Sequence, residues 1–121
     1  GSIVNMGSGA ALIGMPNLIA YGVSKGGVVT LTKYLAIQYG RDNVRSNCIL
    51  PGLIMTEQIL ENAPDAEKMY RRTVPFNRAG RPEDIAGMVA YLMSDEAGFV
   101  NGQILHCDGG GSAGDAEPID L

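Results

Sequence analysis

The sequence predicts an α/β fold in which three parallel strands are joined by crossover helices. Strand-like and helix-like apolar patterns alternate along the chain in the order strand, helix, strand, helix, strand. That alternation is typical of a parallel sheet with right-handed connections. The 121 residues also include 17 glycines, about twice the usual share, which indicates many tight turns and close backbone approaches.

The first half of the chain contains a strand and the most strongly patterned helix. The strand is predicted at 3–6 and leads into a Gly- and Ser-rich loop at 7–14, which Pro16 closes. A helix follows at 20–39, and Gly40 is predicted as its C′ residue. The apolar positions of this helix at helical spacing include Val28, Leu31, Leu35 and Ile37.

The second half continues the alternation. A buried strand is predicted at 44–50 and stops at Pro51 and Gly52. Two short polar helices are expected at 56–63 and 65–72. Pro at a first helical position, followed by two carboxylates, predicts another helix. It begins at Pro82, and its apolar positions are Ile85, Met88, Val89 and Leu92. A last strand is predicted at 103–107.

Composition excludes several classes of function. Hydrophobic residues make up 45% and charged residues 18%, which is typical of one globular domain. The net charge is -4 and the basic residues are scattered, so nucleic acid is not an expected partner. No apolar run reaches the ~20 residues that span a bilayer, so no membrane partner and a cytoplasmic location are expected. Cys48 and Cys107 lack metal-site spacing and are expected to be buried, reduced thiols.

Tyr21 and Lys25 are four residues apart at the start of the predicted helix 20–39, so they share one helical face. An ammonium beside a phenol favours the phenolate, and the phenol is then able to act as a general acid or base near neutral pH. By itself this spacing is weak evidence. The alternative is an exposed helical pair without chemistry.

Two loops are expected to meet at one crevice. Ser8 follows the first strand, and the Pro51-Gly52 turn follows the second. Ligands of open α/β sheets bind at the carboxyl ends of strands, where both loops lie. A hydroxyl there is able to hold a substrate oxygen, although Ser in such a loop is more often only a turn former.

Taken together, six segments resemble the short-chain dehydrogenase/reductase family in order and spacing. They are Gly1-Ser2-Ile3-Val4-Asn5-Met6-Gly7-Ser8, Tyr21-Gly22-Val23-Ser24-Lys25-Gly26-Gly27, Pro51-Gly52-x-Ile54-x-Thr56, Gly80-Arg81-Pro82-Glu83-Asp84-Ile85-Ala86, Gly102-Gln103 and Asp108-Gly109-Gly110. The resemblance implies the C-terminal half of a Rossmann-type doubly wound parallel sheet. Residues 1–111 would form the catalytic half of the family's domain, and 112–121 a mobile acidic tail.

The resemblance also implies an activity, the interconversion of a secondary alcohol and a ketone with NAD or NADP. Its catalytic residues would be Ser8, Tyr21 and Lys25, with the Tyr hydroxyl as proton donor or acceptor. Its cofactor-binding residues would be Met6, Tyr21, Lys25, Pro51, Gly52, Ile54 and Thr56, with the last four at the nicotinamide carboxamide. The implied partners are a small alcohol or ketone and further copies of the chain, as a homo-oligomeric dimer or tetramer. Gly7 replaces a Ser common before the catalytic Ser, and a change in pocket polarity only is expected.

Several alternatives stay open. The family's Gly-rich phosphate-binding turn does not occur in these residues, so the chain is a truncated protein, one half of a two-chain site, or a natural half-length relative. It is therefore an oxidoreductase seen in part, a non-catalytic oligomerising relative, or a binder without redox chemistry.

His106 is expected to be structural. The segment 57–77 corresponds to the family's variable substrate loop, where a set of apolar residues forms either a pocket wall or plain packing. The set is Met55, just before this segment, with Ile59, Leu60, Met69 and Phe76 inside it.

Overall fold

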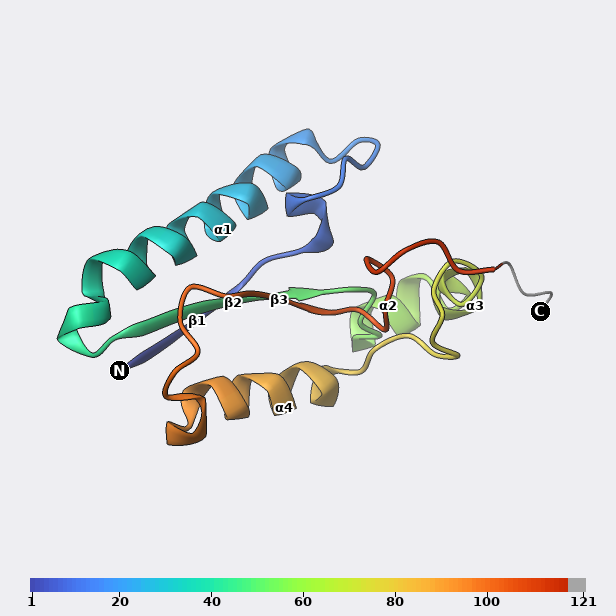
Figure 1. Ribbon diagram of the computed structural model, residues 1–121. Helices are drawn as coiled ribbons and strands as arrows, with labels where there is room; N and C mark the ends of the chain where they lie inside the picture. The colour runs from blue at the N-terminus through green and yellow to red at the C-terminus, as the bar shows by residue number, and fades with distance from the viewer. Residues whose placement is uncertain (118–121) are drawn as a thin grey trace.

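The computed structural model describes residues 1–117, and a three-stranded parallel sheet lies at its centre (Figure 1). The prediction of a strand, helix, strand, helix, strand order is confirmed. The strands are β1 (Ser2–Met6), β2 (Arg45–Pro51) and β3 (Ile104–Cys107), and the long helices are α1 (Ile19–Tyr39) and α4 (Pro82–Met93). Shorter helices are α2 (Glu57–Asn62) and α3 (Ala66–Tyr70), with the 3-10 turns η1 (Gly9–Ala11), η2 (Gly40–Asp42) and η3 (Asp95–Ala97).

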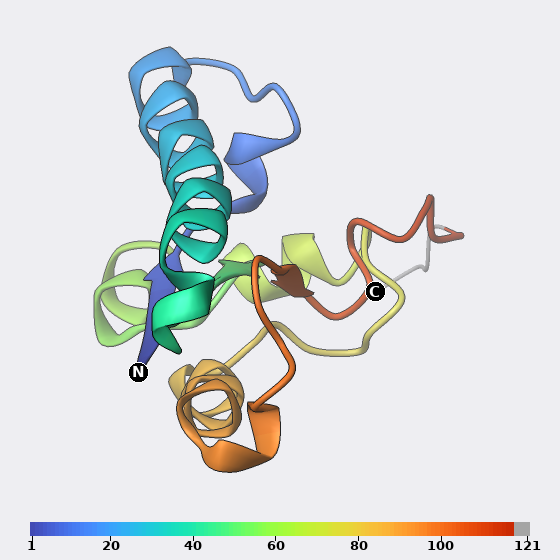
Figure 2. The ribbon, with the colours of Figure 1, turned by 60° about the vertical axis from the view of Figure 1, so that its left-hand side comes forward.

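The strands lie in the order β1-β2-β3, so β2 is central. In the register of the sheet, Asn5 lies opposite Cys48, and Cys48 lies opposite Ile104. The two long helices cover opposite faces, with α1 on one side and α4 on the other (Figure 2). The carboxyl ends of the strands point toward α2 and α3, and the first turns of α1 lie at the same end of the sheet (Figure 1).

The core lies around β2. On the α1 face, Val29 packs with Cys48 and Leu50, and all three are buried. The side of α1 that faces the sheet carries Val29, Thr32 and Ala36. Two predicted apolar positions of this helix, Leu31 and Ile37, point away from the core instead and are 49% and 86% exposed.

Two amide side chains, of the buried Asn47 and the half-buried Asn101, fix the connection from α4 to β3. Asn47 is fully buried in the middle of β2, and its amide donates to Val100 O at 2.9 Å and accepts from Gln103 N at 3.0 Å. Asn101 accepts from Ser46 N at 2.9 Å and donates to Ala36 O at 3.2 Å. Buried amides with satisfied hydrogen bonds specify one arrangement of neighbouring segments.

Helix α1 ends differently from the sequence prediction. Gly40 has φ -59° and continues into η2, while the left-handed conformation is taken by Asn43 at φ 60°. Asn tolerates this region through its short polar side chain, so the turn needs no Gly at 40.

Smaller elements extend beyond the carboxyl ends of the strands. The predicted helices 56–63 and 65–72 are present as the shorter α2 and α3, and the Thr56 hydroxyl caps α2 by accepting from Ile59 N at 3.4 Å. Within the predicted tail, Ser112 N donates to Asp108 Oδ2 at 2.9 Å, and 118–121 lie outside the described residues. Over residues 1–117, no helix combines the length and the apolar character that a membrane crossing requires.

Candidate active site

A cavity of about 430 Å³ lies at the carboxyl ends of β2 and β3. Ser8, which follows β1, and Pro51 and Gly52, at the end of β2, line this cavity together. Its other walls come from η1 and the loop after it, from the segment that follows α3, and from β3 with its final turn. They include Ile13, Met15, Leu53, Tyr70, Thr73, Val74, His106, Asp108 and Ser112. The two loops predicted to share a crevice therefore do so.

Ser8 has the local, turn-forming role that was the alternative to holding a substrate oxygen. Its backbone is extended, at φ -160°, and its Oγ accepts from Ala10 N at 3.2 Å as the N-cap of η1. This bond uses the oxygen as an acceptor, and the hydroxyl hydrogen stays available for a ligand in the cavity. The turn-forming and ligand-facing interpretations of Ser8 are therefore compatible.

The first turns of α1 bring Tyr21 and Lys25 to the end of β1. Lys25 Nζ donates to Met6 O at 3.1 Å and lies 5.7 Å from the centroid of the Tyr21 ring. Gly22 allows η1 to approach this end of the helix, because a Cβ there would lie 3.2 Å from Ala10 O. Tyr21 is 44% exposed.

The remaining predicted residues are placed by backbone pairing. Ile54 forms a parallel bridge with Gly80, and Gly80 N donates to Leu53 O at 2.9 Å. This pairing joins the turn after β2 to the segment before α4. Ile54, Thr56 and Tyr21 do not line this cavity, and they do not line the smaller cavity described below.

Gly7 matters for packing, which corrects the expectation of an effect on polarity alone. A Cβ at Gly7 would collide with Leu50 Cδ2 and lie 3.0 Å from Cys48 Sγ. Leu50 and Cys48 are fully buried and cannot easily move aside. Glycine at position 7 therefore leaves the space that the buried Leu50 and Cys48 side chains of β2 occupy.

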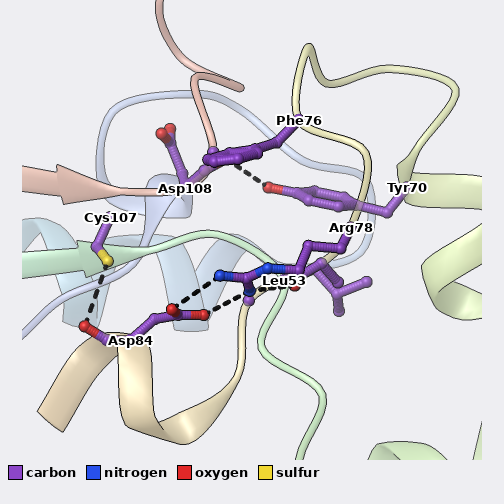
Figure 3. Close-up of a pocket in the computed structure, with 10 residues that line it drawn as sticks. Leu53, Tyr70, Phe76, Arg78, Asp84, Cys107 and Asp108 are labelled. Carbon is purple, nitrogen blue, oxygen red and sulfur yellow. Dashed lines mark hydrogen bonds and ion pairs between the residues drawn. The ribbon is translucent and has the colours of Figure 1, made fainter.

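A second cavity of about 210 Å³ lies on the α4 side of the same strand ends (Figure 3). At its edge the Arg78 guanidinium holds the Asp84 carboxylate in two hydrogen bonds, of 2.7 and 3.0 Å. The side-chain bond from Arg78, together with the Arg81 backbone N–H, lowers the pKa of Asp84 to about 2. Phe76 and Cys107 also line this space.

Asp108 organises the turn after β3. Burial raises the pKa of this carboxyl, but hydrogen bonds from Ser112 and Gly110 outweigh burial and hold the pKa below its usual range. His106 Nδ1 lies 3.6 Å from Asp108 Oδ2. The His106 side chain also forms part of the wall of the larger cavity.

Sequence reasoning missed Tyr70. Its hydroxyl donates to Asp108 O at 3.0 Å, and its ring lines both cavities. Burial raises the pKa of this phenol. Of the five apolar residues whose role was left open, only Phe76 lines either cavity, while Leu60 and Met69 are 54% and 67% exposed. In residues 1–117, no three His, Cys, Asp or Glu side chains are grouped to hold a metal ion.

Comparison with known proteins decides the family. A family model described as enoyl-(acyl carrier protein) reductase matches residues 1–112. A solved short-chain type dehydrogenase/reductase from Mycobacterium ulcerans is 38% identical, with a TM-score of 0.85. The chain belongs to the short-chain dehydrogenase/reductase family. The predicted resemblance is confirmed.

Two other family members are similar over the same region. A 7alpha-hydroxysteroid dehydrogenase from Clostridium sardiniense is 45% identical over 115 residues, which are 94% of this chain and 44% of that protein. A solved 4-hydroxyisoleucine dehydrogenase complexed with NADH is 37% identical, with a TM-score of 0.83 over 94% of this chain and 47% of that one. The Mycobacterium ulcerans structure is matched over 98% of this chain and 44% of its own length. The chain thus spans less than half the length of these relatives.

Proposed function

We propose that the protein is an NAD(P)-dependent oxidoreductase that interconverts a secondary alcohol and a ketone. One observation carries the proposal. The Lys25 ammonium bridges the Met6 carbonyl and the Tyr21 ring at the end of the sheet where Ser8 lines a ligand-sized cavity. A cation beside a partly exposed phenol, at the same end of the sheet as a second hydroxyl that lines a cavity, suits proton transfer at a substrate oxygen.

The residues present fit the nicotinamide end of a dinucleotide cofactor. Lys25 Nζ has three donors and uses one on Met6 O, which leaves two for ribose hydroxyls. Pro51 and Gly52 form a cavity wall where main-chain groups would meet the carboxamide, with Ile54 and Thr56 following in the same turn. The cavity of about 430 Å³ lies within the usual range of ligand sites, roughly 300–1,000 Å³. Solved relatives with bound NADH and with bound NADP support NAD or NADP as the cofactor.

In this mechanism a bound nicotinamide supplies or accepts the hydride. Tyr21 donates a proton to the substrate oxygen when a ketone is reduced, and it removes one when an alcohol is oxidised. The Lys25 ammonium, 5.7 Å from the centroid of the Tyr21 ring, places a positive charge beside the site of proton transfer. Ser8, whose oxygen already accepts from Ala10 N, points its free hydrogen at the substrate oxygen.

The proposal includes assembly of the chain into a homo-oligomer. The outer face of α1 carries large apolar side chains that the chain itself leaves uncovered, and contiguous apolar surface often marks an interface. They are Ile19, Val23, Tyr34 and Ile37, which are 84%, 71%, 71% and 86% exposed. Sedimentation of the complete protein tests this part, and a monomer at all concentrations would contradict it.

Cofactor titration separates the oxidoreductase from the alternatives. The complete gene product that carries these residues is titrated with NADH and NADPH, then assayed with a panel of secondary alcohols and ketones. Saturable binding of one cofactor and turnover of a panel member support the proposal. A stable oligomer that binds neither cofactor would instead support the non-catalytic hypothesis. Cofactor binding without turnover of any secondary alcohol or ketone in the panel would contradict the proposed reaction and would support the binder without redox chemistry.

A further inference from the structure

The two cavities at the strand ends are neighbours with a shared wall. Leu53, Tyr70 and Asp108 line both of them. Leu53 and Asp108 belong to the turns after β2 and β3, whose backbones the sheet holds in place. Tyr70 comes instead from the end of α3, within the segment 57–77, which is called the loop segment below. Tyr70 is therefore the part of the shared wall that the loop segment contributes.

The Tyr70 hydroxyl lies where the two strand-end turns meet. It donates to Asp108 O at 3.0 Å and lies 3.5 Å from the position that a Cβ at Gly111 would take. A Cβ at Gly52 would collide with the same hydroxyl. Glycine at 52 therefore leaves the space in which Tyr70 reaches across the turn. In Figure 3 the Tyr70 ring extends from the loop segment toward Asp108.

We propose that Tyr70 is a specificity-determining and positioning residue. Its ring divides the strand-end space into two cavities, and its hydroxyl fastens the loop segment over the larger one. The inference rests on the proposed function, because it assigns the larger cavity to the substrate. The natural substrate is then a ketone or alcohol with a compact body, confined to the space beside Ser8.

The smaller cavity would accept the rest of a longer substrate if the wall were removed. Its surface is mainly apolar, formed by Leu53, Phe76 and Ala79, with the Arg78–Asp84 pair at the edge. That guanidinium is already paired in two hydrogen bonds, so it offers no free charge to an anionic group. The added space suits an alkyl chain better than a carboxylate or phosphate.

Kinetics with matched ketones test the dividing role. Short and long straight-chain methyl ketones are compared in the complete protein and in Tyr70→Ala and Tyr70→Phe. In Tyr70→Ala the ratio of kcat/KM for long over short ketones rises about tenfold or more, since single methylenes in a pocket carry effects of that size. Tyr70→Phe keeps the ring and leaves the ratio unchanged. Tyr91→Ala, on the exposed side of α4, is the matched control.

Limited trypsin digestion tests the fastening role without relying on activity. Lys68 and Arg72 flank Tyr70 and are exposed. Loss of one hydrogen bond in Tyr70→Phe speeds cleavage at these sites roughly two- to tenfold, while Tyr91→Phe does not. Unchanged cleavage in Tyr70→Phe would overturn the fastening role.

An unchanged kcat/KM ratio in folded Tyr70→Ala would overturn the dividing role. If that variant does not fold, Tyr70→Val carries the same expectation. If the wild type turns over no ketone, the proposed function fails by itself. The dividing role is then decided by NMR titration with the long methyl ketone, which should bind more tightly to the smaller-residue variant than to the wild type. Equal affinity of the variant and the wild type for the long methyl ketone would reject the dividing role.

Discussion

Gly52 lies at the closest approach between the strand-end turns, so Gly52→Ala probes the site directly. An alanine Cβ would lie 2.8 Å from Asp108 Cβ and 2.9 Å from Asp108 Cα, and would also meet the Tyr70 hydroxyl. Asp108 Cα is backbone, so it moves only if the turn after β3 moves. Gly52 N also donates to Cys107 O at 3.0 Å, which ties the two turns together.

The expected cost follows from overpacking. Added carbon in a close-packed site costs about 1–3 kcal/mol, and rotation of Tyr70 alone cannot relieve a contact with backbone. The free energy of unfolding from urea denaturation should therefore fall by about 1–3 kcal/mol, with the m-value unchanged. Loss of the Tyr70 position should also speed tryptic cleavage of the loop segment.

Gly87→Ala is the matched control for Gly52→Ala. Gly87 is exposed inside α4, and no heavy atom of another segment lies within 4 Å of the position that a Cβ would take there. Alanine is favoured over glycine in a helix interior by about 1 kcal/mol, so this variant should be more stable than the wild type. Opposite signs for the two variants are the expected outcome. A Gly52→Ala protein as stable as the wild type would refute the close approach.

Two further predictions concern titratable groups. Asp84→Asn removes the ion pair with Arg78 and weakens the hydrogen bond from Arg81 N. The pKa of Asp84 is about 2 in the folded protein, against an ordinary 3.8. The wild type should therefore have a higher urea midpoint than Asp84→Asn above about pH 4, and this difference should disappear as the pH falls toward 2. A midpoint difference that persists unchanged at pH 2 would contradict this. Burial raises the pKa of the Cys48 and Cys107 thiols, so both should react slowly with iodoacetamide at neutral pH, the fully buried Cys48 more slowly. Mass spectrometry of native against urea-unfolded protein measures both rates, and equal rates in the two states would count against burial.

Local signals predicted most of the fold. Pro82 with its two following carboxylates identified the start of α4, and the apolar runs placed all three strands within a residue or two. The side of α1 that packs against the sheet was harder to predict. Ile37 has the helical spacing of a core residue, but it lies on the outer face, because Thr32 and Ala36 are the small residues that approach the sheet.

Long-range contacts could not be predicted from sequence. Tyr70 contacts Asp108 across 38 residues, and no local pattern links the end of a five-residue helix to the turn after β3. The same holds for Asn47, which lies in a strand predicted to be buried and whose side-chain hydrogen bonds go to Val100 and Gln103, more than 50 residues away. In the candidate site, the Tyr21 and Lys25 spacing was readable because one helix presents both residues.

Tyr21 as the proton donor is tested most directly by Tyr21→Phe in the complete protein. Cofactor dissociation constants are measured by titration, and kcat with the best ketone found in the panel. Positioned acid–base groups contribute about 10²–10⁴-fold to rates, so kcat should fall by about a hundredfold or more while cofactor binding is retained. Normal turnover of the ketone by Tyr21→Phe would contradict the proposed mechanism.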